Sequence, residues 1–220
     1  MTIKSIKLWH YPATRSARAK WALHETWGDD FTVQPIALFE MAQLEPEYLA
    51  MNPNHNVPVL ELTMEDGTHH TMLESAAMVE FLVDGFPDKN LAPPPGLGTA
   101  RADYLHMLHF ASTWMDMMLW QIRLQEHLLP EKLRDEKVIR YYREKFVREV
   151  EPQLLGRLEN QPFICGEVFT GADIIMGHNV FWAQFYGLAK NDVCDAYLAR
   201  LGERPAFQKA FADIGTERIT

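Results

Sequence analysis

The sequence is poor in cysteine and in positive charge, and each shortage makes a class of protein unlikely. Its 220 residues include two cysteines, Cys165 and Cys194, which lie far apart and form no CxxC pair. A secreted disulfide scaffold and a cysteine zinc site are therefore not expected. The net charge of -9 argues against a nucleic-acid-binding surface, which needs basic residues to neutralise phosphates.

The sequence also has few long apolar runs. None approaches the length of a membrane span, and residues 1–12 lack the apolar segment of a secretory signal. We therefore expect a cytoplasmic protein with no membrane partner. The adjacent His69 and His70 would point to opposite sides of a strand, with no carboxylate at ligand spacing, so no metal site is predicted there. Apolar residues still make up 47% of the chain, which is enough for a globular core.

Residues 8–23, LWHYPATRSARAKWAL, are the strongest candidate for chemistry. The pattern predicts a strand over residues 3–10, a turn held by proline, and a helix over residues 16–27 that Gly28 ends. Thr14 and Ser16 place two hydroxyls at the start of this helix, where unpaired N–H groups favour an anion. The alternative is that one hydroxyl merely caps the helix, a position that such residues often occupy.

The next elements fit a sheet with helices packed on it. We predict an edge strand over residues 31–36, a short helix over 46–51, and a hairpin of strands 57–62 and 69–73 followed by a helix from residue 74. The run APPPGLG, residues 92–98, predicts a domain boundary, because consecutive prolines cannot continue a helix.

Everything after this boundary has a helical pattern. The predicted segments are residues 99–119, 131–158, 174–185, 196–201 and 205–212. Thr170 and Asp173 have the form of a capping box before the third of these segments, so Asp173 is expected to be structural and not catalytic.

Three sequence pieces occur in a characteristic order: NPNHNVPVLEL at residues 52–62, LESAAMVEFL at 73–82 and FTGADI at 169–174. Together with the Thr14 turn they resemble the glutathione transferase superfamily, and the resemblance spans essentially the whole chain. It implies an α/β thioredoxin-like domain over residues 1–86, a linker over 87–98 and an all-α domain over 99–220. It also implies a homodimer that uses glutathione as co-substrate and needs no metal.

The resemblance assigns the glutathione-binding residues. It implies a cis peptide before Pro58, so that the backbone of Val57 binds the cysteinyl part of glutathione as an added strand would. Glu74 and Ser75 are expected at a helix N-terminus, where Ser75 receives the γ-glutamyl carboxylate and Glu74 the ammonium group. Asn56 replaces the usual lysine and is expected to donate a neutral hydrogen bond. A strand-entry proline and an ordinary helix cap are the structural alternatives.

Thr14 is the predicted thiol-activating residue. It lies four residues before Arg18, as the catalytic serine of serine-type members lies before a similar arginine. Ser16 and Tyr11 are the alternatives, although Tyr11 lies one position after the place of the family's catalytic tyrosine, which His10 occupies. A free thiol has a pKa near ~8.5, and lowering it by about two units needs roughly 2.7 kcal/mol of thiolate stabilisation.

The position of the catalytic cysteine in cysteine-type members falls near Arg15. The chain therefore cannot form a mixed disulfide there, and the resemblance to glutaredoxin-like members is weakened.

A co-substrate pocket is expected between the Thr14 turn and the first helix of the second domain. The candidate wall residues are Tyr11, Phe110, Trp114, Met115 and Met118. Core packing is the alternative for at least half of them.

The predicted function is a glutathione transferase that activates the thiol for attack on an electrophilic, hydrophobic small molecule, the chemistry of detoxification. Two alternatives stay open. One is a glutathione-dependent disulfide-bond reductase, and the other is a non-catalytic binding or protein-interaction module with the same fold. The identity of the electrophile is not encoded in these motifs, since function resides in the site and not in the fold.

Overall fold

A computed structural model describes residues 2–215 and divides the chain into two compact units. The first unit contains the residues up to Asn90 together with those from Glu203 onward, and the second contains Leu91–Gly202. The chain thus passes from one unit to the other inside the predicted linker. The expected helical domain ran to residue 220, whereas the structure groups the last described helix with the first unit.

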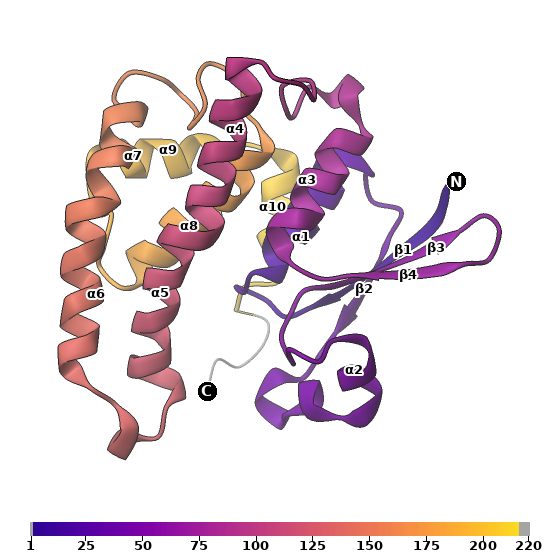
Figure 1. The fold of residues 1–220 in the computed structure, drawn as a ribbon, viewed down its shortest axis with the longest axis horizontal. Helices are drawn as coiled ribbons and strands as arrows, with labels where there is room; N and C mark the ends of the chain where they lie inside the picture. The colour runs from indigo at the N-terminus through magenta and orange to yellow at the C-terminus, as the bar shows by residue number, and fades with distance from the viewer. Residues whose placement is uncertain (1, 216–220) are drawn as a thin grey trace. The chain divides into compact units, whose positions relative to one another are not determined.

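A four-stranded mixed sheet forms the centre of the first unit (Figure 1). Its strands are β1 (Ile3–His10), β2 (Thr32–Pro35), β3 (Val59–Met64) and β4 (His69–Met72), in the order β2-β1-β3-β4. β1 pairs parallel with β2 and antiparallel with β3, and β3 pairs antiparallel with β4. β2 is therefore an edge strand, as predicted. β3 begins two residues later than predicted, because Pro58 has no N–H group to donate to the ladder.

Helices cover both faces of this sheet (Figure 1). α1 (Ser16–Thr26) and α3 (Ser75–Gly85) pack together on one face, and the short α2 (Pro46–Met51) lies on the other side. Short 3-10 turns at Leu38–Glu40 and Ala42–Leu44 precede α2, and a third at Pro87–Lys89 follows α3. α1 stops where predicted, with Gly28 at a φ of 91° that favours glycine.

The last described helix, α10 (Pro205–Phe211), packs on α1. The Trp21 ring of α1 is fully buried and makes edge contacts with Phe207, at 4.9 Å between centroids, and with Phe211, at 6.1 Å. Arg204, just before α10, donates two hydrogen bonds to the Glu25 carboxylate, at 2.6 and 2.8 Å. These contacts fasten the segment after residue 203 to the helix that carries the Thr14 turn at its start.

The second unit is helical throughout, as predicted. α4 (Thr99–His109) continues through a π-helical segment (Phe110–Met115), α5 (Asp116–Arg123) and a second π-helical segment (Leu124–Leu128). A 3-10 turn (Glu131–Leu133) leads to α6 (Glu136–Glu149), α7 (Glu151–Leu158), α8 (Gly171–Phe185) and α9 (Asp192–Gly202). The single helix predicted over 131–158 is divided, because Pro152 is accommodated only in the first turn of a new helix.

The predicted capping box at the start of α8 is confirmed. The Thr170 N–H and hydroxyl lie 2.8 and 3.0 Å from Asp173 Oδ2, and the Ile164 N–H and Tyr197 hydroxyl donate to Oδ1 at 2.7 and 2.9 Å. Asp173 is fully buried and supports the core helix, as expected. Within residues 2–215 no helix is both long and apolar enough to cross a membrane.

Candidate active site

The turn between β1 and α1 gathers two hydroxyls around the backbone of Tyr11. Thr14 Oγ1 lies 2.7 Å from the Tyr11 carbonyl oxygen and 2.8 Å from Ser16 Oγ. Ser16 Oγ in turn accepts a hydrogen bond from the Tyr11 N–H at 3.1 Å. Ser16 is fully buried and Thr14 is half-buried. Of the two residues, Thr14 is therefore the more accessible to a ligand.

The predicted capping role of these hydroxyls is only partly seen. Arg15 occupies the N-cap position of α1, and the first turn of the helix is closed by backbone bonds from Ala17 to Thr14 and from Arg18 to Arg15. The Thr14 hydroxyl also accepts from the Ser16 N–H at 3.3 Å. The two hydroxyls also form polar contacts with each other, with Tyr11 and with His10.

His10 is a buried member of this site that the sequence motifs did not single out. Its side chain is 2% exposed, and its Nδ1 lies 2.7 Å from Ser16 Oγ. Its Nε2 lies 3.0 Å from Asp213 Oδ2, which also accepts from Lys20 Nζ at 2.5 Å. Burial opposes ionisation of Asp213, but the hydrogen bonds from His10 and Lys20 prevail and lower the pKa of its carboxyl to about 2.

Val57, the next predicted binding residue, immediately precedes Pro58. The Val57–Pro58 peptide is cis, as the family resemblance implied. Within residues 2–215 the N–H and C=O groups of Val57 make no hydrogen bond. Val57 belongs to one apolar cluster with Tyr11, Ile36, Tyr48 and Val59. Tyr11, at the start of the Thr14 turn, and Val57 are thus held in the same apolar cluster.

Asn52 holds the loop before Val57, and sequence analysis missed this role. It is fully buried, and its Nδ2 donates to the carbonyl oxygen of Asn56 at 2.7 Å and to Asn56 Oδ1 at 2.9 Å. The Tyr48 hydroxyl donates to the same carbonyl at 2.7 Å. Because the side-chain oxygen of Asn56 is engaged in this way, its amide nitrogen is oriented as the donor, and Asn56 is exposed.

Glu74 and Ser75 lie at the start of α3, where the sequence placed them. Glu74 has a φ of 71°, a region that non-glycine residues seldom adopt, and it is exposed. The Ser75 hydroxyl is buried and accepts a hydrogen bond from Arg18 Nη1 at 3.3 Å. Arg18, which is 1% exposed, therefore links the helix after Thr14 to the helix start that carries Ser75.

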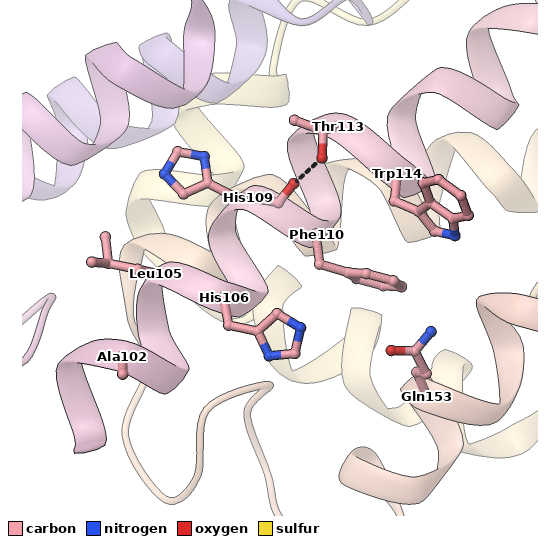
Figure 2. A pocket seen from close by; sticks show the side chains of 8 residues that line it. All are labelled: Ala102, Leu105, His106, His109, Phe110, Thr113, Trp114 and Gln153. Atoms are coloured by element: carbon pink, nitrogen blue, oxygen red, sulfur yellow. Dashed lines mark hydrogen bonds between the residues drawn. The ribbon is translucent and has the colours of Figure 1, made fainter.

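The second unit contains an open hollow of about 650 Å³ along α4 and the π-helical segment, shown in Figure 2. It is lined by Ala102, Leu105, His106, His109, Phe110, Thr113, Trp114 and Gln153. Of the predicted pocket residues, Phe110 and Trp114 line this hollow. Met115 and Met118 are fully buried and are core side chains, and Tyr11 lies in the apolar cluster of the first unit.

The π-helical segment is stabilised by side chains that bind its backbone carbonyls. The Thr113 hydroxyl donates to the His109 carbonyl at 2.7 Å (Figure 2). The buried Asn179 of α8 donates to the Ala111 carbonyl at 2.7 Å. These side-chain bonds add to the backbone hydrogen bonds of the wider helical turn, in which the Asp116 N–H donates to the Ala111 carbonyl.

The two cysteines are free and belong to the second unit. Burial raises the pKa of the Cys165 thiol to about 12 and that of Cys194 to about 11. Neither supplies a thiolate near neutral pH. In the part of the chain that the structure describes, no three His, Cys, Asp or Glu side chains gather in a way that would hold a metal ion.

Comparison with known proteins agrees with this geometry. Residues 14–84 match the family described as glutathione S-transferase, N-terminal domain. Glutathione S-transferase GstA of Escherichia coli O157:H7 is 28% identical over 216 residues, which cover 96% of this chain and 99% of the relative. The disulfide-bond oxidoreductase YfcG of Escherichia coli K12 is 27% identical over 205 residues, covering 86% and 87%.

Among solved structures, the glutathione transferase URE2P8 of Phanerochaete chrysosporium, crystallised with oxidized glutathione, superposes with a TM-score of 0.81. The two sequences are 21% identical, and the match covers 98% of each chain. Residues 14–84 therefore match the glutathione S-transferase N-terminal domain family, and the chain as a whole shares the fold of this solved glutathione transferase.

Proposed function

We propose that the chain is a glutathione transferase in which the Thr14 hydroxyl stabilises the thiolate of bound glutathione for attack on an electrophilic, hydrophobic small molecule. The observation that carries this proposal is the unpaired backbone of Val57, which belongs to the same apolar cluster as Tyr11 at the start of the Thr14 turn. An extended peptide can pair with this N–H and C=O as an added strand. Such pairing would direct the cysteinyl side chain of glutathione toward Thr14.

The two ends of glutathione find complementary groups in the same unit. The N–H groups at the start of α3 and the Ser75 hydroxyl suit the γ-glutamyl carboxylate, and the exposed Glu74 side chain suits the ammonium group. The glycyl carboxylate is expected to accept a hydrogen bond from the Asn56 amide nitrogen. This bond is weaker than the salt bridge of the usual lysine, so we expect modest affinity for glutathione.

The Thr14 hydroxyl must turn its hydrogen from the Tyr11 carbonyl to the sulfur. Loss of a neutral hydrogen bond costs about 1 kcal/mol. The first N–H groups of α1 add favourable electrostatics for an anion, and these offset the cost of turning the hydroxyl.

The proposal is tested with Thr14→Ala and the matched variant Thr14→Ser. We measure the pH dependence of kcat/KM with glutathione and an aromatic halide, and we verify folding by circular dichroism. Thr14→Ala should fold and should raise the kinetic pKa of the bound thiol, and Thr14→Ser should restore it. An unchanged pH profile in Thr14→Ala would remove Thr14 from the mechanism.

A disulfide-bond reductase is the second candidate, and similarity to the relative named a disulfide-bond oxidoreductase favours it. In that reaction a second glutathione would occupy the co-substrate pocket. Turnover of a small disulfide compared with that of an aromatic halide separates the two activities. A non-catalytic module is the remaining alternative, and the absence of any thermal shift with millimolar glutathione would favour it.

The proposal includes a homodimer, as the resemblance implied, and the cytoplasmic location expected from the sequence. The expected particle has twice the 25.4 kDa mass of one chain. Light scattering coupled to gel filtration measures this mass directly, and a single-chain mass at micromolar concentration would contradict the dimer.

A further inference from the structure

Four polar side chains of the first unit form a continuous line. Asp213 Oδ2 lies 3.0 Å from His10 Nε2, His10 Nδ1 lies 2.7 Å from Ser16 Oγ, and Ser16 Oγ lies 2.8 Å from Thr14 Oγ1. His10 and Ser16 are buried, whereas Thr14 is half-buried. A hydrogen-bonded path thus runs from a buried imidazole to the hydroxyl that we assign to the thiol.

The order carboxylate, imidazole, hydroxyl is also that of a hydrolase nucleophile. Ser16, however, is fully buried, so it cannot attack a substrate. Thr14, the next residue in the line, is half-buried and therefore more accessible to a ligand than Ser16. The arrangement therefore suits transfer of a proton through Ser16 better than attack by Ser16.

We propose that His10 takes up the proton of the bound thiol through the Thr14 and Ser16 hydroxyls, and that Asp213 holds the imidazole for this task. The inference rests on the proposed function, since it concerns how the same thiol is ionised. His10 and Asp213 do not touch the substrate, so both are positioning residues that act through the two hydroxyls.

Before transfer, each hydrogen bond in the line has one direction. A neutral His10 donates from Nε2 to Asp213, so its Nδ1 accepts the hydrogen of Ser16. Ser16 Oγ accepts from the Tyr11 N–H and from the Thr14 hydroxyl, which uses both of its lone pairs. Thr14 Oγ1 then presents a lone pair to the S–H group of glutathione.

Transfer reverses three bonds and conserves every proton. The S–H bond breaks and its proton goes to Thr14 Oγ1. Thr14 passes its own proton to Ser16 Oγ, and Ser16 passes its proton to His10 Nδ1. The products are a thiolate and an imidazolium. Each hydroxyl now donates toward the sulfur, and the Tyr11 N–H still donates to Ser16. After the thiolate has attacked the electrophile, the imidazolium returns the proton to water.

The charged groups around His10 favour this transfer. The Asp213 carboxylate, in contact with Nε2, stabilises the imidazolium, and its own pKa of about 2 keeps it ionised. Lys20 opposes the imidazolium by charge, but its ammonium contacts the same carboxylate oxygen at 2.5 Å and helps to keep that oxygen negative. Without His10, the two neutral hydroxyls could pass the proton of the thiol only to solvent.

A purely structural role is the competing explanation. In that case the His10–Asp213 contact only fastens the segment after α10 to the sheet, and its loss would lower stability without altering the thiol. The chain offers a matched control, because Asp29 contacts His24 Nδ1 at 2.9 Å and Lys209 Nζ at 2.5 Å, away from the hydroxyls. Asp213→Asn and Asp29→Asn therefore each remove a carboxylate that contacts one histidine and one lysine. Only Asp213 is connected to the hydroxyls, through His10.

The test counts the protons released per thiolate formed. Glutathione binding to wild type, His10→Gln, Asp213→Asn and Asp29→Asn is measured by calorimetry in two buffers of different ionisation enthalpy. The thiolate is quantified by its ultraviolet absorbance in the same samples. S-methylglutathione, which has no thiol, corrects for other protons that binding moves. Folding of each variant is verified by circular dichroism.

We expect wild type and Asp29→Asn to release almost no protons per thiolate, because His10 keeps them. His10→Gln should release about one proton per thiolate, and its thiolate should form at a pH about one unit higher. Asp213→Asn should likewise release more protons per thiolate than the wild type and should form its thiolate at a higher pH. Release of one proton per thiolate by the wild type would overturn the inference and leave the proposed function intact. Absence of any thiolate in the wild type would overturn both.

Discussion

The first unit contains two clusters of the same composition that differ in what they contact. The inner cluster is His10, Lys20 and Asp213, and the outer cluster is His24, Asp29 and Lys209. In each, one carboxylate accepts from one imidazole and one ammonium, and the contact joins the α1 region to the segment around α10.

Burial and neighbours separate the two clusters. The His10 side chain is 2% exposed and Asp213 27%, against 12% for His24 and 63% for Asp29. The second nitrogen of His10 continues to the Ser16 hydroxyl, whereas the His24 ring packs edge-on against Phe31. The outer cluster is thus an exposed structural contact. The inner cluster has the same residue types, but it continues through Ser16 to Thr14.

The largest loss of kcat/KM should come from removing the Thr14 hydroxyl. We expect Thr14→Ala to lower kcat/KM at neutral pH by roughly 100-fold, since a single hydroxyl donor to a developing anion has about this value. In this background Asp213→Asn should cause no further loss, because the inner cluster acts only through Thr14. Steady-state kinetics of the double-mutant cycle measure this coupling, and additive losses would contradict it.

The second effect compares the two carboxylates directly. Asp213→Asn should lower kcat/KM at neutral pH about tenfold, which corresponds to a one-unit rise in the pKa of the bound thiol. Asp29→Asn should stay within about twofold of the wild type, because the outer cluster does not contact the hydroxyls. Kinetics under identical conditions give both values, and equal losses would show that the inner cluster has no special role.

A smaller effect concerns how the free energy of unfolding depends on pH through Asp213. The folded pKa of Asp213, about 2, lies below its ordinary value of 3.8, so the stabilisation is present above about pH 4 and disappears as the pH falls through about 2. At neutral pH we expect Asp213→Asn to lower the free energy of unfolding by roughly 2 kcal/mol, since it leaves Lys20 buried without its partner. Urea unfolding at pH 7 and pH 3 should show this difference shrinking.

The smallest effect belongs to the outer cluster. Lys209→Met should change the free energy of unfolding by less than about 0.5 kcal/mol, because exposed ion pairs are weak and are screened by salt. Urea unfolding at low and high salt measures it. A loss as large as that of Asp213→Asn would mean that burial does not separate the clusters.

The sequence predicted those features that depend on neighbouring residues. The period of two in β1, the Gly28 stop, the capping box at Thr170 and the hairpin over residues 57–73 each depend on residues that are close in the sequence. The cis peptide before Pro58 followed from the family resemblance and is confirmed. The placement of Glu74 and Ser75 at the start of α3 followed from the residue pattern that predicts a helix from residue 74.

The inner cluster was missed because its contacts are not local. His10 and Asp213 lie 203 residues apart, and no pattern near either residue indicates the other. One signal was present: His10 follows Ile6 and Leu8 in the alternation of β1, so it points into the core, where an imidazole requires a polar partner. The assignment of α10 to the first unit was missed for the same reason.

The central claim is that the buried cluster, and not a surface cluster of equal composition, sets the ionisation of the thiol at Thr14. The most direct measurement is the pH titration of thiolate absorbance for glutathione bound to Asp213→Asn and to Asp29→Asn. We predict a pKa of the bound thiol about one unit above wild type for Asp213→Asn and no change for Asp29→Asn. The same pKa in both variants would contradict the account.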